Sequence, residues 1–171
     1  TVIHKKIIES PAYRRKFNQV SDSDRVNRIA WQRSKEMLTH RSGTRYEDIA
    51  FVDYLTGKSK INKEYHEEST AKPNKGMIEM LYNSKPNTII AIHNHPGSSV
   101  PSLADLMTCK KRAYKFGLVV CHDGKIYKYS VDKEKFNAPI ASSALAQLEI
   151  KGYNDNVRSI FEDAGVKMEV L

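Results

Sequence analysis

One segment constrains the fold more than any other: residues 88–92, Thr-Ile-Ile-Ala-Ile, are almost uninterruptedly apolar. The segment has the length of a strand, and it is apolar on both faces. Strands of this kind are usually buried in the middle of a sheet that is covered on both sides. Pro86 precedes it, and a loop containing Pro96, Gly97 and Pro101 follows it. The chain is therefore expected to build a covered sheet around this strand.

Periodicity, caps and turn signals place the other elements before and after this strand. The expected helices cover residues 11–17, 24–42, a stretch from Pro73, 102–117, 139–150 and 155–164. The expected strands cover residues 46–52, a polar return strand at 59–69, 118–121, 125–129 and 166–171. Asp123-Gly124 is a good signal for a short hairpin between two of them. The sequence predicts an α/β fold: a mixed sheet flanked by helices.

The composition is that of an ordinary globular protein of 171 residues, a length typical of one domain. No apolar run approaches the ~18 residues of a membrane span, and the N-terminus does not resemble a signal peptide. We therefore expect a cytoplasmic protein without a membrane partner, in which Cys109 and Cys121 are reduced. Because the chain starts with Thr1, we also expect a processed product or a fragment of a longer protein.

The net charge of +8 is concentrated near the N-terminus. Residues 1–45 hold 11 Lys/Arg and 4 Asp/Glu, whereas residues 46–171 hold 17 and 16. This basic segment could contact nucleic acid or an acidic partner surface. A solvated helix face explains the charge equally simply, because no aromatic-interleaved binding motif accompanies it.

The central strand is followed directly by His93-Asn94-His95-Pro96. Two histidines that are two apart on an extended chain point to the same side, where they can share one metal ion. Ser102 can cap the next helix, and Asp105, three residues later, then faces back towards the preceding loop. Two imidazoles and one carboxylate form a common catalytic zinc set that leaves a fourth position for water.

Activation of that water requires a general base within hydrogen-bond reach. Glu47, at the start of the strand at 46–52, is the best candidate. The adjacent Asp48 competes for this role, but its side chain should point to the other face of the strand. The remaining histidines are expected near a helix end, on the surface and in the hairpin turn: His40, His66 and His122.

The pattern His93-x-His95-Pro96 followed by Ser102-x-x-Asp105 resembles the JAMM motif of MPN domains. Glu47 with the small residue Ala50 fits the first-strand part of the same signature. The string His-Asn-His-Pro and the order of elements over about residues 46–130 look most like the RadC-like bacterial and phage branch. The resemblance implies an MPN fold, which is similar to that of cytidine deaminases.

The same resemblance implies a role for each matching residue. Zn²⁺ would be bound by His93, His95 and Asp105, Glu47 would be the general acid and base, and Ser102 would donate a hydrogen bond to the oxyanion. The implied reaction is hydrolysis of a peptide or isopeptide bond in a protein or peptide substrate, such as a ubiquitin-like or phage structural protein. This chain has five residues between Pro96 and Ser102, whereas the family pattern usually has six.

On this interpretation the chain divides into a basic helical extension at 1–45, a JAMM-like core at 46–135, and C-terminal helices at 136–171 that pack on the core. Two other hypotheses stay open. The domain could be a catalytically silent MPN-like scaffold, encoded by a phage or mobile element. It could also be a RadC-like protein that associates with nucleic acid through its basic extension.

Overall fold

The computed structural model describes residues 2, 3 and 5–171. One six-stranded mixed sheet runs through it in the order β2-β1-β3-β4-β5-β6. Its strands are β1 (Ile49–Asp53), β2 (Ser59–Asn62), β3 (Ile89–His95), β4 (Phe116–Cys121), β5 (Ile126–Val131) and β6 (Val166–Val170). β3 and β4 pair in parallel, and the other neighbouring pairs of these six strands are antiparallel.

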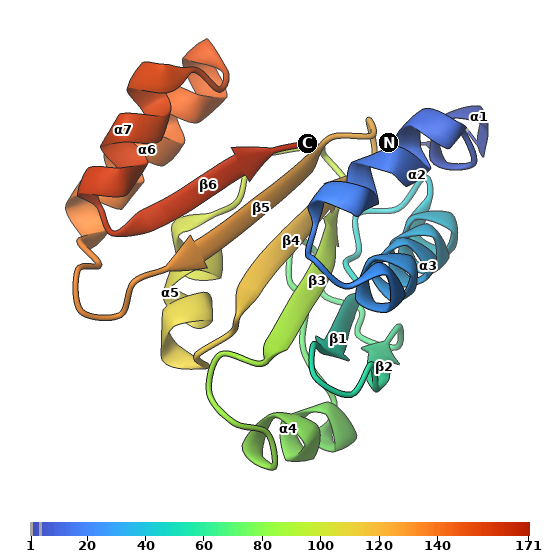
Figure 1. The fold of residues 1–171 in the computed structure, drawn as a ribbon. Coiled ribbons are helices and arrows are strands. Elements are labelled where there is room, and N and C mark those ends of the chain that lie inside the picture. Colours follow the sequence, from blue (N-terminus) through green and yellow to red (C-terminus); the bar gives the residue numbers. More distant parts are fainter. Residues whose placement is uncertain (1, 4) are drawn as a thin grey trace.

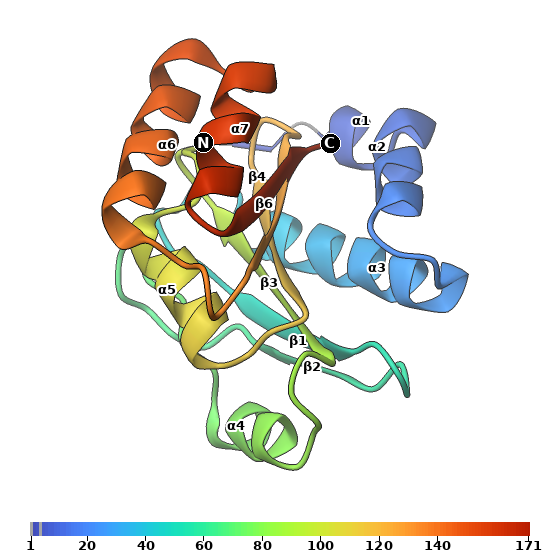
Figure 2. The same ribbon diagram turned by 60° about the vertical axis from the view of Figure 1, so that its left-hand side comes forward.

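Helices cover both faces of this sheet (Figures 1 and 2). One face carries α1 (Lys5–Ile8), α2 (Pro11–Lys16), a 3-10 turn (Phe17–Gln19) and α3 (Asp24–Arg41). The other carries α5 (Leu103–Lys111), α6 (Ala138–Lys151) and α7 (Asp155–Asp163), and α4 (Lys75–Tyr82) adds Met77 to that side of the core. The expected α/β architecture, a mixed sheet flanked by helices, is confirmed.

β3 lies inside the sheet, as its composition predicted, and all seven of its residues are buried. Its alternate side chains pack into two hydrophobic cores, one on each face of the sheet. Ile90 and Ile92 pack beneath the N-terminal helices, whereas Ile89 and Ala91 face the side of α5. The strand therefore carries its last three residues, His93 to His95, into the centre of the molecule.

The N-terminal helices belong to the core of the sheet. Phe17, Val26, Met37 and Leu38 are fully buried in the cluster that also contains Ile92. Ser10 and Ser23 accept the capping hydrogen bonds of α2 and α3. The described part of residues 1–45 thus forms one outer layer of the molecule.

Three expected boundaries were wrong. The return strand ends at Asn62, because the glutamate-rich stretch after it is exposed and makes only a bridge from Tyr46 to Glu68. The first strand begins at Ile49, so Glu47 precedes it. The helix from Ser102 ends at Lys111, and Gly117 lies within β4.

Gly117 has a packing role in that strand. A Cβ atom there would lie 2.3 Å from Cζ of Tyr129 on the neighbouring strand β5. The missing side chain lets the Tyr129 ring lie across β4. This ring forms part of the cavity described below.

Among the helices that the structure describes, none combines the length and the apolar character needed to span a bilayer.

Candidate metal centre

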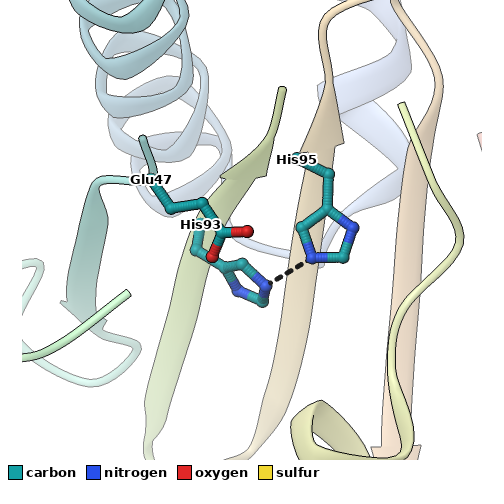
Figure 3. A group of neighbouring side chains, drawn as sticks. All are labelled: Glu47, His93 and His95. Atoms are coloured by element: carbon teal, nitrogen blue, oxygen red, sulfur yellow. Dashed lines mark hydrogen bonds between the residues drawn. The ribbon is translucent and has the colours of Figure 1, made fainter. Parts of the chain in front are cut away.

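The two histidines at the end of β3 point to the same side of the sheet, as their spacing predicted. Their Nε2 atoms lie 3.0 Å apart, and both side chains are buried (Figure 3). Both rings lie on the face that α5 covers, since Asp105 of α5 approaches each of them. The strand period of two residues explains this arrangement.

Asp105 reaches the histidines from the first turn of α5. Its Oδ1 lies 3.4 Å from Nε2 of His93, and its Oδ2 lies 3.4 Å from Nε2 of His95. A capping box holds the carboxylate in place: the Ser102 N–H donates to Asp105 Oδ2 at 2.8 Å, and the Asp105 N–H donates to Ser102 Oγ at 3.1 Å. The short loop from Pro96 to Ser102 therefore still brings Asp105 to both histidines.

Glu47 approaches the same place from the segment that precedes β1. A carboxylate oxygen of Glu47 and one ring nitrogen of each of His93 and His95 all lie within 4.8 Å of one another. Figure 3 shows the Glu47 carboxylate beside the two rings. Glu47 is also buried. The structure thus brings together Glu47, His93, His95 and Asp105, four of the residues that the sequence singled out.

The side-chain ligand atoms lie about as far apart as two ligands of one metal ion. Zinc, for example, binds imidazole nitrogen and carboxylate oxygen at about 2.0–2.1 Å, so two ligands of a tetrahedral site lie about 3.3 Å apart. The two Nε2 atoms are 3.0 Å apart, and each lies 3.4 Å from a different oxygen of the Asp105 carboxylate. These residues could therefore hold a metal ion.

A backbone carbonyl orients one of these imidazoles. Nδ1 of His95 lies 2.9 Å from the Ser99 carbonyl oxygen and 3.1 Å from Ser99 Oγ. A proton on Nδ1 that is donated to the carbonyl leaves Nε2 with its lone pair directed at the site. Sequence reasoning missed Ser99, and only the turn of the loop after β3 brings it to His95.

Burial and charge act against each other in this cluster. Burial raises the pKa of Glu47, although the two histidines oppose this effect. Burial disfavours the charged form of His93, but the Asp105 carboxylate outweighs it and raises the pKa of the ring. Burial also acts to raise the pKa of Asp105, but both imidazoles lower it well below its ordinary range.

A cavity of about 240 Å³ opens beside these residues. It is lined by Glu47, Ser69, Thr70, Ala71, Ala91, His93, Ser102, Ala104, Asp105, Thr108, Tyr114 and Tyr129. Among these described residues, Glu47 and Asp105 are the only acids, and none is Lys or Arg. The cavity is smaller than the ~300–1,000 Å³ typical of cofactor sites.

The competing candidates lie elsewhere. Asp48 points to the other side of the sheet, as predicted, where its carboxylate contacts Arg41 Nε at 2.6 Å and His40 Nδ1 at 2.7 Å. His66 is exposed, and its Nδ1 contacts the Glu64 carbonyl oxygen at 2.6 Å. His122 is buried beside Asn94, at 2.9 Å from Asn94 Nδ2.

Comparison with known proteins leaves the family open: no family model, no curated protein and no solved structure matches the chain. The class that the fold and the cluster define is an α/β protein in which a buried Glu47-His93-His95 group could bind a metal ion.

Proposed function

We propose that this chain is a zinc-dependent hydrolase of peptide or isopeptide bonds, with a site of the JAMM type. One observation carries the proposal: Glu47 lies beside the two histidines, and Asp105 approaches both of them at 3.4 Å. The resemblance of the His93-x-His95-Pro96 and Ser102-x-x-Asp105 motifs to MPN domains supports the same chemistry. Substrates of this class include ubiquitin-like and phage structural proteins.

His93, His95 and Asp105 would hold the zinc ion. When bound, zinc polarises the carbonyl of the scissile bond and lowers the pKa of the attacking water to roughly 7. The chain itself supplies the proton transfers. Glu47 accepts a proton from the attacking water as the oxygen bonds to the carbonyl carbon, and it delivers that proton to the amine as the C–N bond breaks.

Ser102 is the candidate oxyanion donor. Its Oγ accepts the hydrogen bond of the Asp105 N–H, and this contact leaves the hydroxyl proton free to point into the cavity. A donor directed at the developing negative charge stabilises the transition state of acyl transfer. Asp105 would serve as a ligand through its carboxylate, and Glu47, which is not one of the three proposed ligands, would carry the proton.

Glu47→Gln tests the proposal. The variant should keep about one zinc per chain and lose hydrolysis of quenched peptide and isopeptide substrates by ~10²–10⁴-fold, because the amide cannot accept the proton. Elemental analysis and fluorescence assays measure the two quantities. The double variant His93→Ala/His95→Ala should lose the zinc as well. Glu162→Gln, which changes an exposed glutamate of α7 outside the lining of the cavity, is the matched control and should change neither quantity.

Three outcomes would contradict the proposal. Purified protein that takes up no zinc during dialysis against it would exclude the metal site. A Glu47→Gln variant as active as the wild type would remove the assigned base. A zinc-loaded protein that cleaves no substrate would favour the catalytically silent scaffold.

A further inference from the structure

Asn94 lies between the two candidate zinc ligands in β3 and faces the opposite way. Its side chain is fully buried on the side of the sheet where Asp48 and α3 meet. It cannot contact the zinc site directly, because successive strand residues point to opposite faces. Its contacts nevertheless lead back to that site.

The backbone pairing between β1 and β3 ends at Ile49 and His93. One residue further on, the side chain of Asn94 makes the hydrogen bonds to this segment in place of the backbone. Its Oδ1 accepts a hydrogen bond from the Asp48 N–H at 2.7 Å, and its Nδ2 donates to the Tyr46 carbonyl oxygen at 3.3 Å. These two groups belong to the two peptide units that join Glu47 to the chain. A single amide thus holds the backbone on both sides of Glu47.

The orientation of the Asn94 amide follows from its partners. The Asp48 N–H requires an acceptor, so the oxygen must face Asp48. The two hydrogens on Nδ2 then face the Tyr46 carbonyl oxygen and Nε2 of His122, which lies 2.9 Å away. Both ends of the amide therefore have partners, and a rotated amide would lose them.

The far end of the segment is anchored to α3. The Asp48 carboxylate contacts Arg41 Nε at 2.6 Å and His40 Nδ1 at 2.7 Å. Arg41 also donates to the carbonyl oxygens of Lys63 at 2.8 Å and Tyr65 at 3.0 Å. Asp48 and Arg41 are both buried, so this ion pair is difficult to separate. The chain around Glu47 is thereby held from β3 and from α3.

We infer that Asn94 is a positioning residue for the reaction: it holds the backbone of residues 46–48 so that the Glu47 carboxylate stays beside His93 and His95. This inference rests on the proposed role of Glu47 as the general base. It adds a residue that touches neither metal nor substrate. A base displaced by about 1 Å can cost on the order of 10²-fold in rate, so the loss of these bonds should be measurable.

Asn94→Ala removes both hydrogen bonds to the backbone around Glu47 and leaves every candidate zinc ligand in place. We expect kcat to fall by about 10- to 100-fold with KM nearly unchanged, because the cavity that receives the substrate is untouched. Zinc content should stay at that of the wild type. Asn18→Ala, a surface asparagine whose side chain contacts Arg14, is the matched control and should behave as the wild type does.

A double-variant cycle separates positioning from general destabilisation. If Asn94 acts through Glu47, Asn94→Ala should slow hydrolysis strongly in the wild type and hardly at all in the Glu47→Gln background. A loss of the same size in both backgrounds would overturn the inference. Full activity of Asn94→Ala beside an inactive Glu47→Gln would overturn it too, while leaving the proposed function intact. Full activity of Glu47→Gln would instead overturn the proposed function.

Asn94→Ser covers the case in which the alanine variant does not fold. The serine hydroxyl is uncharged and polar, but it is too short to reach both the Asp48 N–H and the Tyr46 carbonyl oxygen. We expect an intermediate loss of kcat, again confined to backgrounds that contain Glu47. An Asn94→Ser variant with the kcat of the wild type would contradict the inference that Asn94 must hold the backbone on both sides of Glu47.

Discussion

At the scale of single residues, two adjacent acids show how position decides chemistry. Asp48 meets Arg41 and His40 on one side of the sheet, where its charge is compensated. Glu47 faces the histidine pair on the other side, and burial raises its pKa. Strand-like alternation predicted their opposite directions. It did not predict Arg41 as the partner of Asp48, because the two meet only when α3 packs on the sheet.

The two cysteines give a prediction at this scale. Burial raises the pKa of Cys109 and of Cys121 to about 12, so both thiols stay protonated at neutral pH and lack the reactive thiolate. In native protein at about pH 7.5, a disulfide reagent should titrate neither thiol within minutes, and both should react at once in denaturant. Absorbance of the released thiolate measures this. Rapid reaction of the folded protein would show that one of the thiols is accessible.

At the scale of elements, the first turn of α5 does two things. The capping box between Ser102 and Asp105 satisfies free N–H groups at the start of the helix, and it holds the carboxylate that faces His93 and His95. The sequence predicted both the cap and the direction of Asp105, because they depend only on local spacing. The loop that is one residue shorter than the family pattern is compatible with this geometry.

Substitutions of Ser102 separate its capping role from its proposed catalytic role. Ser102→Ala should destabilise the protein by about 1 kcal/mol and slow hydrolysis, because it loses the cap and the hydroxyl. Ser102→Gly should keep most of the stability and lose the rate, since glycine at an N-cap costs only a few tenths of a kcal/mol and has no hydroxyl. Ser102→Thr should keep both. Urea unfolding and kcat measure the two effects. A Ser102→Gly variant with full activity would mean that Ser102 only caps the helix.

At the scale of the whole molecule, the basic N-terminal segment is a structural layer. α2, the 3-10 turn and α3 bury Tyr13, Phe17 and Val26 against the sheet, while Arg15 and Arg28 remain exposed. Deleting residues 1–45 would therefore expose the core, and the loss of folding would hide any effect on binding. A test of this surface has to change charges instead.

Nucleic-acid binding through this face stays a prediction with a clear test. The triple variant Arg14→Gln/Arg15→Gln/Arg28→Gln should weaken binding to duplex DNA. The slope of the logarithm of the binding constant against the logarithm of the salt concentration should also become shallower. The change is up to about 0.9 for each phosphate that the protein no longer neutralises. Fluorescence anisotropy over a salt series measures both. Lys110→Gln/Lys111→Gln on α5 is the control, since it changes basic residues on the opposite face of the sheet. Unchanged binding by the triple variant would place any interface elsewhere.

The sequence by itself determined most helices and strands, the central place of β3 and four residues of the candidate site. These features depend on interactions over a few residues: alternation along a strand, the spacing of a capping box, and an Asp-Gly turn. It overestimated the strand after Ser59, because that stretch lies at the edge of the sheet, where polar residues gain little from pairing.

Only the tertiary structure decided how Glu47 is held. Its backbone is bracketed by Asn94, which is 46 residues from Asp48 in the sequence, and its neighbour Asp48 is anchored by Arg41 of α3. Such contacts leave no local pattern, because they form between segments that meet only when the sheet closes and the helices pack on it. The same packing buries the Glu47 carboxyl and so raises its pKa, an effect that no local pattern in the sequence encodes.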